Sequence, residues 1–231
     1  MNTDLIVALD VPDADAAVAA VATLPDAVRY YKIGLELYCA EGPRVAQQVR
    51  ERGKNIFLDL KLHDIPRTVE RAVRSISGLG VSMFTVHAAG GRAMLKAAVE
   101  ATRATHGTSP KVIAVTALTS LDANDLADIG VHRSPAEQVR ALARFAIECG
   151  VDGLVCSPQE VQDLRTMLGP KPILITPGIR PSGGDAGDQK RVATPAAAAK
   201  AGASFLVVGR PILEAPDPAG AAKAVLDEIG R

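Results

Sequence analysis

The stretch NIFLDLKLHDIPRTVERAVRSI (55–76) joins a mostly apolar run to a segment with helical periodicity. The first part, NIFLDLKL (55–62), has the length and composition of a strand that is buried on both faces. In RTVERAVRSI (67–76) the apolar residues are spaced three and four positions apart, which is typical of an amphipathic helix. The stretch therefore predicts one strand followed by one helix, the repeating unit of parallel α/β folds.

The same alternation recurs along the whole chain. Alanine-rich segments with helical periodicity separate seven further apolar runs. These runs are LIVALD (5–10), VRYYKIG (28–34), SMFTVHA (82–88), KVIAVTAL (111–118), GLVCS (153–157), PILITPG (172–178) and FLVVGR (205–210). Eight strands within 231 residues favour a single-domain (β/α)8 TIM barrel over residues 1–231, with an open doubly wound sheet as the alternative.

Composition excludes several classes of partner. The chain has 26 basic and 26 acidic residues and no charge run, so we expect no nucleic-acid partner. No apolar run approaches the ~20 residues of a membrane span, and no signal peptide is indicated. The odd number of cysteines and the absence of C-x-x-C spacing predict free thiols in a reducing, cytoplasmic setting.

Polar residues follow or end most of the predicted strands. In a TIM barrel the chemistry takes place at the carboxyl ends of the strands. The residues at these positions are Asp10, Lys32, Asp59, Lys61, His87, Thr119, Ser120, Ser157, Gly178, Arg180, Gly209 and Arg210. Their gathering at one end of the barrel predicts an active site.

The strongest local signal is DLKLHDIPRT (59–68). Side chains at positions i and i+2 of a strand point to the same face, so Asp59 and Lys61 share a face with Phe57. Unpaired buried charges are unfavourable, so we expect these charges to neutralise one another, with Lys32 reaching the same mouth from the neighbouring strand. Asp64 lies past the strand end and points either inward, where it completes a neutral cluster of four charges, or across to another subunit. From charge alone, a salt-bridge network that only closes the barrel is the alternative.

The strand-seven and strand-eight ends predict a phosphate site. They read TPGIR (176–180) and VVGRPI (207–212), and barrels often bind phosphate in the loops after these strands. Arg180 or Arg210 would add charge-assisted hydrogen bonds, and Gln189 would fold over the ligand. Ordinary turn glycines and surface arginines are the alternative interpretation.

Together these motifs resemble the orotidine 5'-monophosphate decarboxylase family. The resemblance runs from about residue 5 to 225 and is most specific in its combination of segments. The matching segments are ALD (8–10), YKIGLEL (31–37), DLKLHDIPRTV (59–69), TPGIR, DQKRVATP (188–195) and VVGRPI. The resemblance implies decarboxylation of orotidine 5'-monophosphate to UMP and CO2, the last step of de novo UMP synthesis.

The resemblance also implies roles for the charged residues. Lys61 would protonate C6 of the pyrimidine, and Asp59 would lie against the substrate carboxylate. Lys32 and Asp64 would complete the charge array, with Asp64 supplied by the partner subunit of a homodimer. We see no departure from the family pattern at these four positions.

Further residues would bind the nucleotide. Asp10 and Thr68 would hold the ribose and its neighbourhood, and Pro177 would pack near the base. Thr119 would bond the pyrimidine edge, with Ser120 as an equal alternative. The implied phosphate ligands are Arg180, Gln189, Gly209 and Arg210.

We expect no metal and no organic cofactor. The glycine pairs at 90–91 and 183–184 lack the strand–G-x-G-x-x-G–helix context of a dinucleotide site. Three alternatives remain: a metal-dependent phosphosugar enzyme with the same core, a Schiff-base aldolase using Lys61 or Lys32, and a non-catalytic nucleotide-binding barrel. His63 and His87 are expected near the mouth as bystanders.

Overall fold

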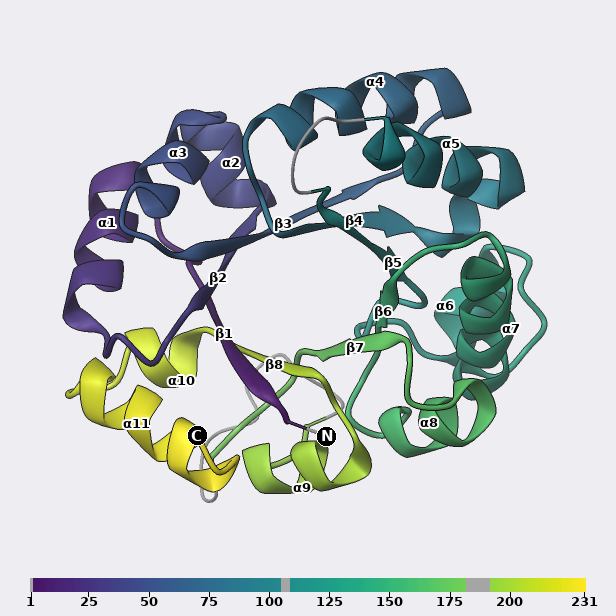
Figure 1. Cartoon of the computed structure of the whole chain (residues 1–231). Coiled ribbons are helices and arrows are strands. Elements are labelled where there is room, and N and C mark those ends of the chain that lie inside the picture. Colours follow the sequence, from purple (N-terminus) through teal and green to yellow (C-terminus); the bar gives the residue numbers. More distant parts are fainter. Residues whose placement is uncertain (1, 105–108, 182–191) are drawn as a thin grey trace.

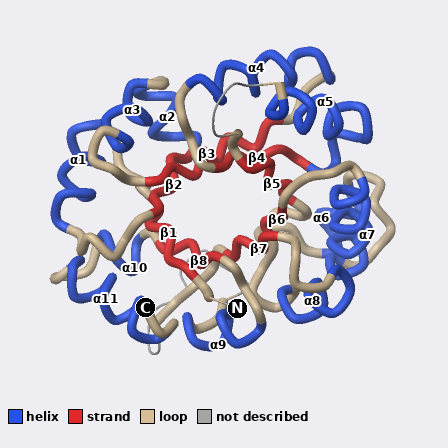
Figure 2. Tube along the Cα trace, in the orientation of Figure 1, coloured by secondary structure: helices blue, strands red, loops and turns tan. Residues whose placement is uncertain are grey.

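Eight parallel strands close into a barrel in which each strand pairs with the next along the chain and β8 pairs with β1 (Figures 1 and 2). The computed structural model describes residues 2–104, 109–181 and 192–231. The strands are β1 (Asp4–Ala8), β2 (Tyr30–Gly34), β3 (Asn55–Leu62), β4 (Met83–His87), β5 (Lys111–Val115), β6 (Gly153–Val155), β7 (Ile173–Thr176) and β8 (Phe205–Val208). The predicted TIM barrel is confirmed, and the open-sheet alternative is wrong.

Helices form an outer ring around the strands (Figure 2). They are α1 (Ala14–Thr23), α2 (Leu35–Glu41), α3 (Arg44–Arg50), α4 (Pro66–Gly78), the 3-10 turn η1 (Ala88–Gly90), α5 (Gly91–Arg103), α6 (Ala123–Asp128), α7 (Pro135–Glu148), α8 (Val161–Leu168), α9 (Pro195–Ala201), α10 (Arg210–Leu213) and α11 (Pro218–Glu228). Several begin at side-chain caps; Ser134, for example, caps α7 in a capping box with Glu137.

Most strands end earlier than the apolar runs predict. The run over 111–118 forms a strand only to Val115, and the run over 172–178 only to Thr176. Proline lacks the N–H that a central strand needs, so Pro177 ends β7. Asp10, predicted to end the first strand, lies two residues beyond Ala8. Several of the polar residues therefore stand on loops at the mouth.

The core has two layers, separated by the strands. Between strands and helices lies a large apolar layer that includes Val7, Tyr31, Leu58 and Phe84. Inside the barrel lies a second cluster, formed by Ile6, Ala8, Phe57, Met83, Ile113, Ile175 and Val207. Asp59 and Lys61, two and four positions after Phe57, line the same cavity as Phe57 near the mouth.

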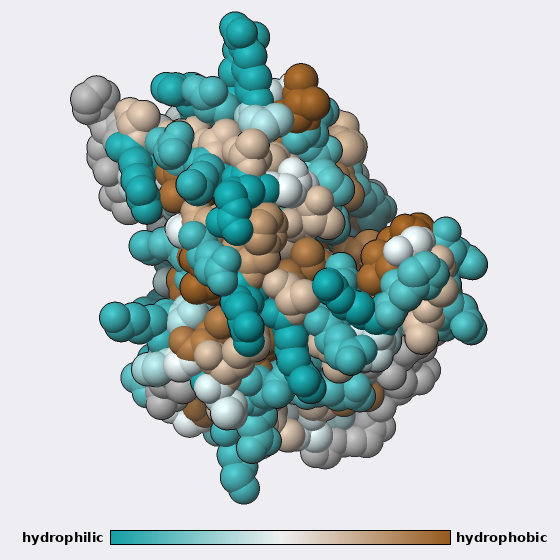
Figure 3. Space-filling model, turned by 90° about the vertical axis from the view of Figure 1, so that its right-hand side faces the viewer, coloured by the Kyte–Doolittle hydropathy of each residue, from teal (hydrophilic) through white to brown (hydrophobic). Residues whose placement is uncertain are grey.

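The outer surface around α6 and α7 is mainly hydrophilic, with small separate hydrophobic areas (Figure 3). Among the described residues, no helix is long and apolar enough to cross a membrane. The three cysteines are free thiols, as predicted; Cys149 and Cys156 are buried, and Cys39 is exposed.

Close packing of β6 on β7 gives a test of the barrel wall. A Cβ atom at Gly153 would overlap the carbonyl oxygen of Ile173 and lie 2.6 Å from its Cβ. We expect Gly153→Ala to lower the free energy of unfolding by about 1–3 kcal/mol, because the strands must move apart. Urea denaturation measures the change.

The matched control is Gly78→Ala at the end of α4, where a Cβ would meet no atom within 4 Å. Alanine in a helix is favoured over glycine by roughly 0.5–1 kcal/mol, so this variant should be as stable as the parent or slightly more so. Equal stability of the Gly153 and Gly78 variants would contradict the packing described here.

Candidate active site

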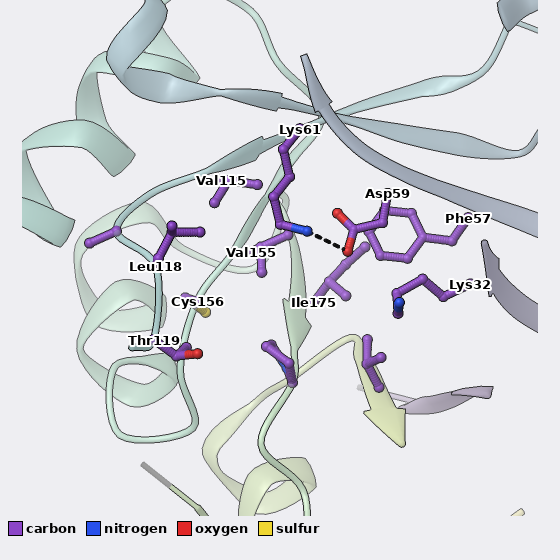
Figure 4. A pocket seen from close by; sticks show the side chains of 13 residues that line it. Lys32, Phe57, Asp59, Lys61, Val115, Leu118, Thr119, Val155, Cys156 and Ile175 are labelled. Atoms are coloured by element: carbon purple, nitrogen blue, oxygen red, sulfur yellow. Dashed lines mark hydrogen bonds and ion pairs between the residues drawn. The ribbon is translucent and has the colours of Figure 1, made fainter. Parts of the chain in front are cut away.

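A cavity opens at the carboxyl ends of the strands, where the inner layer of the barrel meets solvent (Figure 4). Its polar lining comes from Lys32, Asp59, Lys61 and Thr119. The remaining lining is largely apolar and includes Phe57, Val115, Val155, Ile175 and Val207. Charges in such a place interact more strongly than in water because the surrounding side chains exclude solvent.

Asp59 and Lys61 form an ion pair at the end of β3. Lys61 Nζ lies 2.8 Å from Asp59 Oδ2, and the Asp59 side chain is only 13% exposed (Figure 4). The backbone here is not a regular strand, because Lys61 has φ of 52° and is the one described non-glycine residue with positive φ. This conformation costs of order 1–3 kcal/mol, so the surroundings must hold it in place.

The pairing of β3 with β4 is irregular at the same point. Leu58 pairs with Phe84 and Leu62 pairs with Val86, so three residues of β3 face the single Thr85 of β4. Such a bulge redirects side chains and leaves backbone groups without ladder partners. The regular strand assumed from sequence is therefore wrong locally, although Phe57, Asp59 and Lys61 do line one cavity, as expected.

Thr85 occupies the gap that the bulge leaves. Its hydroxyl accepts a 2.8 Å hydrogen bond from the Lys61 N–H and donates a 3.0 Å bond to Asp59 Oδ1. The residue is fully buried. Sequence reasoning missed Thr85; the available signal was a hydroxyl on an inner-face position of the apolar run 82–88.

Lys32 pairs with Asp10, not with Asp59 or Asp64. Its Nζ lies 2.8 Å from Asp10 Oδ1, and its side chain is 13% exposed. Two glycines make room for this pair: a Cβ at Gly34 would lie 2.9 Å from Lys32 Nζ, and a Cβ at Gly209 would lie 3.2 Å from Asp10 Oδ2. Within this chain, the charges at the mouth thus form two ion pairs, Lys61 with Asp59 and Lys32 with Asp10.

Asp64 does not line either mouth cavity of its own chain. It is exposed, its carboxylate accepts a 2.6 Å hydrogen bond from the Ile65 N–H, and it forms no ion pair with the residues that the structure describes. Thr68, two residues into α4, is also exposed and lines neither mouth cavity. Ile65 between them is a large apolar side chain that is 67% exposed.

A second hollow adjoins the first on the side of β7, β8 and β1. The predicted binding residues that line it are Asp10, Lys32, Pro177, Arg180, Gly209 and Arg210. Lys32, Pro177 and Val207 line both hollows, so the two adjoin. Gly178 has φ of 77°, and backbone bonds join Arg180 and Gly178 to Ala193. Gln189 lies outside the described residues.

The structure separates Thr119 from its neighbour. Thr119 lines the cavity, whereas Ser120 is exposed and lines neither mouth cavity. Pro177 lies at the junction of the two hollows. Of the two neighbouring hydroxyl groups, that of Thr119 therefore belongs to a residue at the cavity.

His87 ends β4 beside the charged pair, with its ring centroid 5.3 Å from that of His63. Burial lowers the pKa of His87, and the nearby His63 and Lys61 lower it further. A neutral His87 adds no positive charge that would compete with Lys61. Within the described ranges, no group of three or more His, Cys, Asp or Glu side chains could hold a metal ion.

The lowered pKa of His87 predicts a pH dependence of stability. An unfolded histidine takes up a proton near pH 6.5, but the folded site resists protonation, so acid favours the unfolded chain. Above about pH 6.5, His87 therefore does not change the free energy of unfolding with pH. Below it, His87 lowers the free energy of unfolding progressively as the pH falls. His87→Asn should reduce this decline, measured by urea unfolding between pH 7.5 and 5, whereas substitution of the exposed His132 should leave it unchanged. An identical decline in both variants would refute the assignment.

Comparison with known proteins places the chain in a family. Residues 3–225 match the model of the orotidine 5'-phosphate decarboxylase / HUMPS family. Proteins named orotidine 5'-phosphate decarboxylase are 50% identical in Moorella thermoacetica (97% of this chain, 91% of that protein) and 54% identical in Rhodopseudomonas palustris (97% and 93%). The crystal structure of orotidine 5'-phosphate decarboxylase from Lactobacillus acidophilus superposes with a TM-score of 0.89 at 38% identity, covering both chains fully. The chain belongs to the orotidine 5'-phosphate decarboxylase / HUMPS family.

Proposed function

We propose that this chain decarboxylates orotidine 5'-monophosphate to UMP and CO2, the last step of de novo UMP synthesis. The observation that carries the proposal is the Lys61–Asp59 ion pair, held at 2.8 Å at the inner mouth of an apolar cavity. Family membership and the names of its relatives support the same reaction. The proposed chemistry uses neither a metal ion nor an organic cofactor.

The difficulty of this reaction is the electron pair that CO2 leaves behind. When the bond between C6 and the carboxylate breaks, both electrons stay on C6 in an orbital in the plane of the ring, so the π system cannot delocalise them. Fixed positive charge in a site that excludes water can stabilise such a carbanion. The Lys61 ammonium supplies that charge and then transfers one N–H proton to C6, which completes UMP; the neutral amine regains a proton from water.

Asp59 has two effects in this proposal. It holds the Lys61 ammonium in place, and it lies against the substrate carboxylate, where the repulsion between the two anions falls as CO2 leaves. Destabilisation of the bound substrate is a contested source of rate. We assign the larger effect to preorganised positive charge, because it acts directly on the charge that develops at C6.

The two hollows divide the nucleotide between them. In the first, Thr119 would bond the pyrimidine edge and Pro177 would pack on the base. Asp10 lines the second hollow and would hold the ribose, and its ion-pair partner Lys32, which lines both hollows, would belong to the charge array. Arg180, Gly209 and Arg210 in the second hollow would bind phosphate, together with Gln189. The phosphate group lies away from C6 and does not react. Its binding energy would therefore favour closure of the site around the nucleotide and orientation of the pyrimidine in the transition state.

A second copy of the chain would complete each site. Asp64 and Thr68 do not reach the cavity of their own chain, and the exposed Ile65 stands between them. Burial of that apolar side chain in a homodimer would bring both polar groups to the partner's mouth. Asp64 would then join the charge array, and Thr68 the ribose, across the interface.

Decarboxylation in the presence of EDTA tests the proposal. Purified wild type should consume orotidine 5'-monophosphate, followed by loss of its absorbance, and Lys61→Ala should lose on the order of 10³-fold or more in kcat. The matched control is Lys111→Ala, which removes a lysine that pairs with Asp152 at the opposite end of the barrel. It should keep turnover near the wild-type value.

Other outcomes identify the rivals. No turnover by folded wild type in EDTA, with turnover of a phosphosugar once Mg²⁺ is added, would place the chain among metal-dependent enzymes with the same core. A borohydride-trapped adduct at Lys61 or Lys32 would indicate a Schiff-base aldolase. UMP binding without turnover of any substrate would indicate a binding protein.

Mixing two inactive variants tests the shared site. Lys61→Ala and Asp64→Ala chains, unfolded and refolded together, should form heterodimers in which one site carries both substitutions and the other carries neither. Random pairing restores about one quarter of all sites, so we expect about a quarter of wild-type activity. Absence of recovery after heterodimers are confirmed by mass spectrometry would remove the claim that Asp64 acts across the interface.

A further inference from the structure

We propose that Thr85 is a positioning residue whose single hydroxyl fixes both the backbone of Lys61 and the carboxylate of Asp59. This inference rests on the proposed function, since it concerns the same two side chains. Thr85 is fully buried and does not line the cavity, so it touches no substrate and acts only through its two partners.

The irregular pairing explains why a hydroxyl is needed at this position. Residues 59–61 of β3 face Thr85 alone, so the backbone ladder offers the Lys61 N–H no regular partner. A buried N–H without a partner is unfavourable, and the Thr85 hydroxyl at 2.8 Å supplies that partner. An apolar side chain of the same shape would fill the space without meeting this requirement.

The direction of the bonds makes the arrangement specific. An N–H can only donate, so the Thr85 oxygen must accept from Lys61 and its own proton is directed to Asp59 Oδ1, 3.0 Å away. The other carboxylate oxygen, Oδ2, receives the Lys61 ammonium at 2.8 Å. The three residues thus form a closed ring of hydrogen bonds, and both oxygens of Asp59 are engaged.

The ring matters for catalysis because it holds an unfavourable backbone conformation. Lys61 has φ of 52°, which a lysine keeps only when its surroundings require it. Loss of the Thr85 hydroxyl removes one anchor from the Lys61 backbone and one from Asp59. Both ends of the ion pair would then move relative to the substrate, and small displacements of reacting groups lower rates steeply.

Steady-state kinetics of Thr85→Val and Thr85→Ser test the proposal. Valine keeps the shape without the hydroxyl, so kcat should fall roughly 10- to 100-fold while KM changes less than about 3-fold. Serine keeps the hydroxyl and should restore kcat to within about 5-fold of wild type. Thr116→Val is the control, because it also removes a buried hydroxyl, bonded at 3.0 Å to the Val155 carbonyl, outside the ring; it should leave kcat within about 2-fold.

Crystal structures of wild type and Thr85→Val provide a second test, which does not require a substrate. In the valine variant we expect the φ of Lys61 to become negative and the Lys61 Nζ–Asp59 Oδ2 distance to exceed 4 Å. Thr85→Cys, which keeps a smaller and weakly hydrogen-bonding group, gives the same comparison should the valine chain not fold.

Failure of the two proposals is distinguishable. Lack of turnover by wild type removes the proposed function, whereas the structural comparison still decides the role of Thr85. Wild-type kcat in Thr85→Val, a change confined to KM, or an unchanged Lys61 conformation in its structure would each overturn the positioning role.

Discussion

The mouth of this barrel depends on one local constraint, the bulged pairing of β3 with β4. Because three residues face one, the strand cannot continue its regular alternation, and Lys61 adopts a left-handed conformation beside Asp59. A buried threonine meets the hydrogen-bonding needs that this irregularity creates. The strain is local, and the rigid barrel on either side keeps it from relaxing.

Around the bulge, apolar side chains inside the barrel lie next to the charged residues at its mouth. The inner layer of Phe57, Ile113, Ile175 and Val207 closes the barrel beneath the mouth and excludes water from below the charges. At the end of β2 and just after β8, Gly34 and Gly209 leave space for a second ion pair, Lys32 with Asp10. Two lysines are thereby held at one opening by different carboxylates, and each is oriented before a ligand arrives.

Sequence periodicity predicts most of this architecture. The strand Asn55–Leu62 matches its predicted bounds, and Lys32, Asp59, Lys61, Thr119 and Pro177 line the cavity as expected. The alternation of side chains along a strand does not predict a bulge. It therefore misses the left-handed backbone conformation of Lys61 and the hydrogen bonds of Thr85. It also cannot decide which carboxylate Lys32 selects, because Asp10 reaches it through a loop whose position depends on closure of the barrel. Asp64 and Thr68 are exposed and line neither mouth cavity of their own chain, and a strand pattern cannot predict how the residues after a strand are oriented.

In the proposed mechanism, Lys61 delivers a proton in addition to providing charge. Lys61→Arg tests it most directly, because arginine keeps a positive charge but does not give up its proton at neutral pH. Calorimetry should show that the variant binds UMP within about 10-fold of the wild-type affinity, so the site is intact. Its kcat should nevertheless fall on the order of 10³-fold. Turnover within about 10-fold of wild type would show that positive charge alone is sufficient and would contradict the assignment of Lys61 as proton donor.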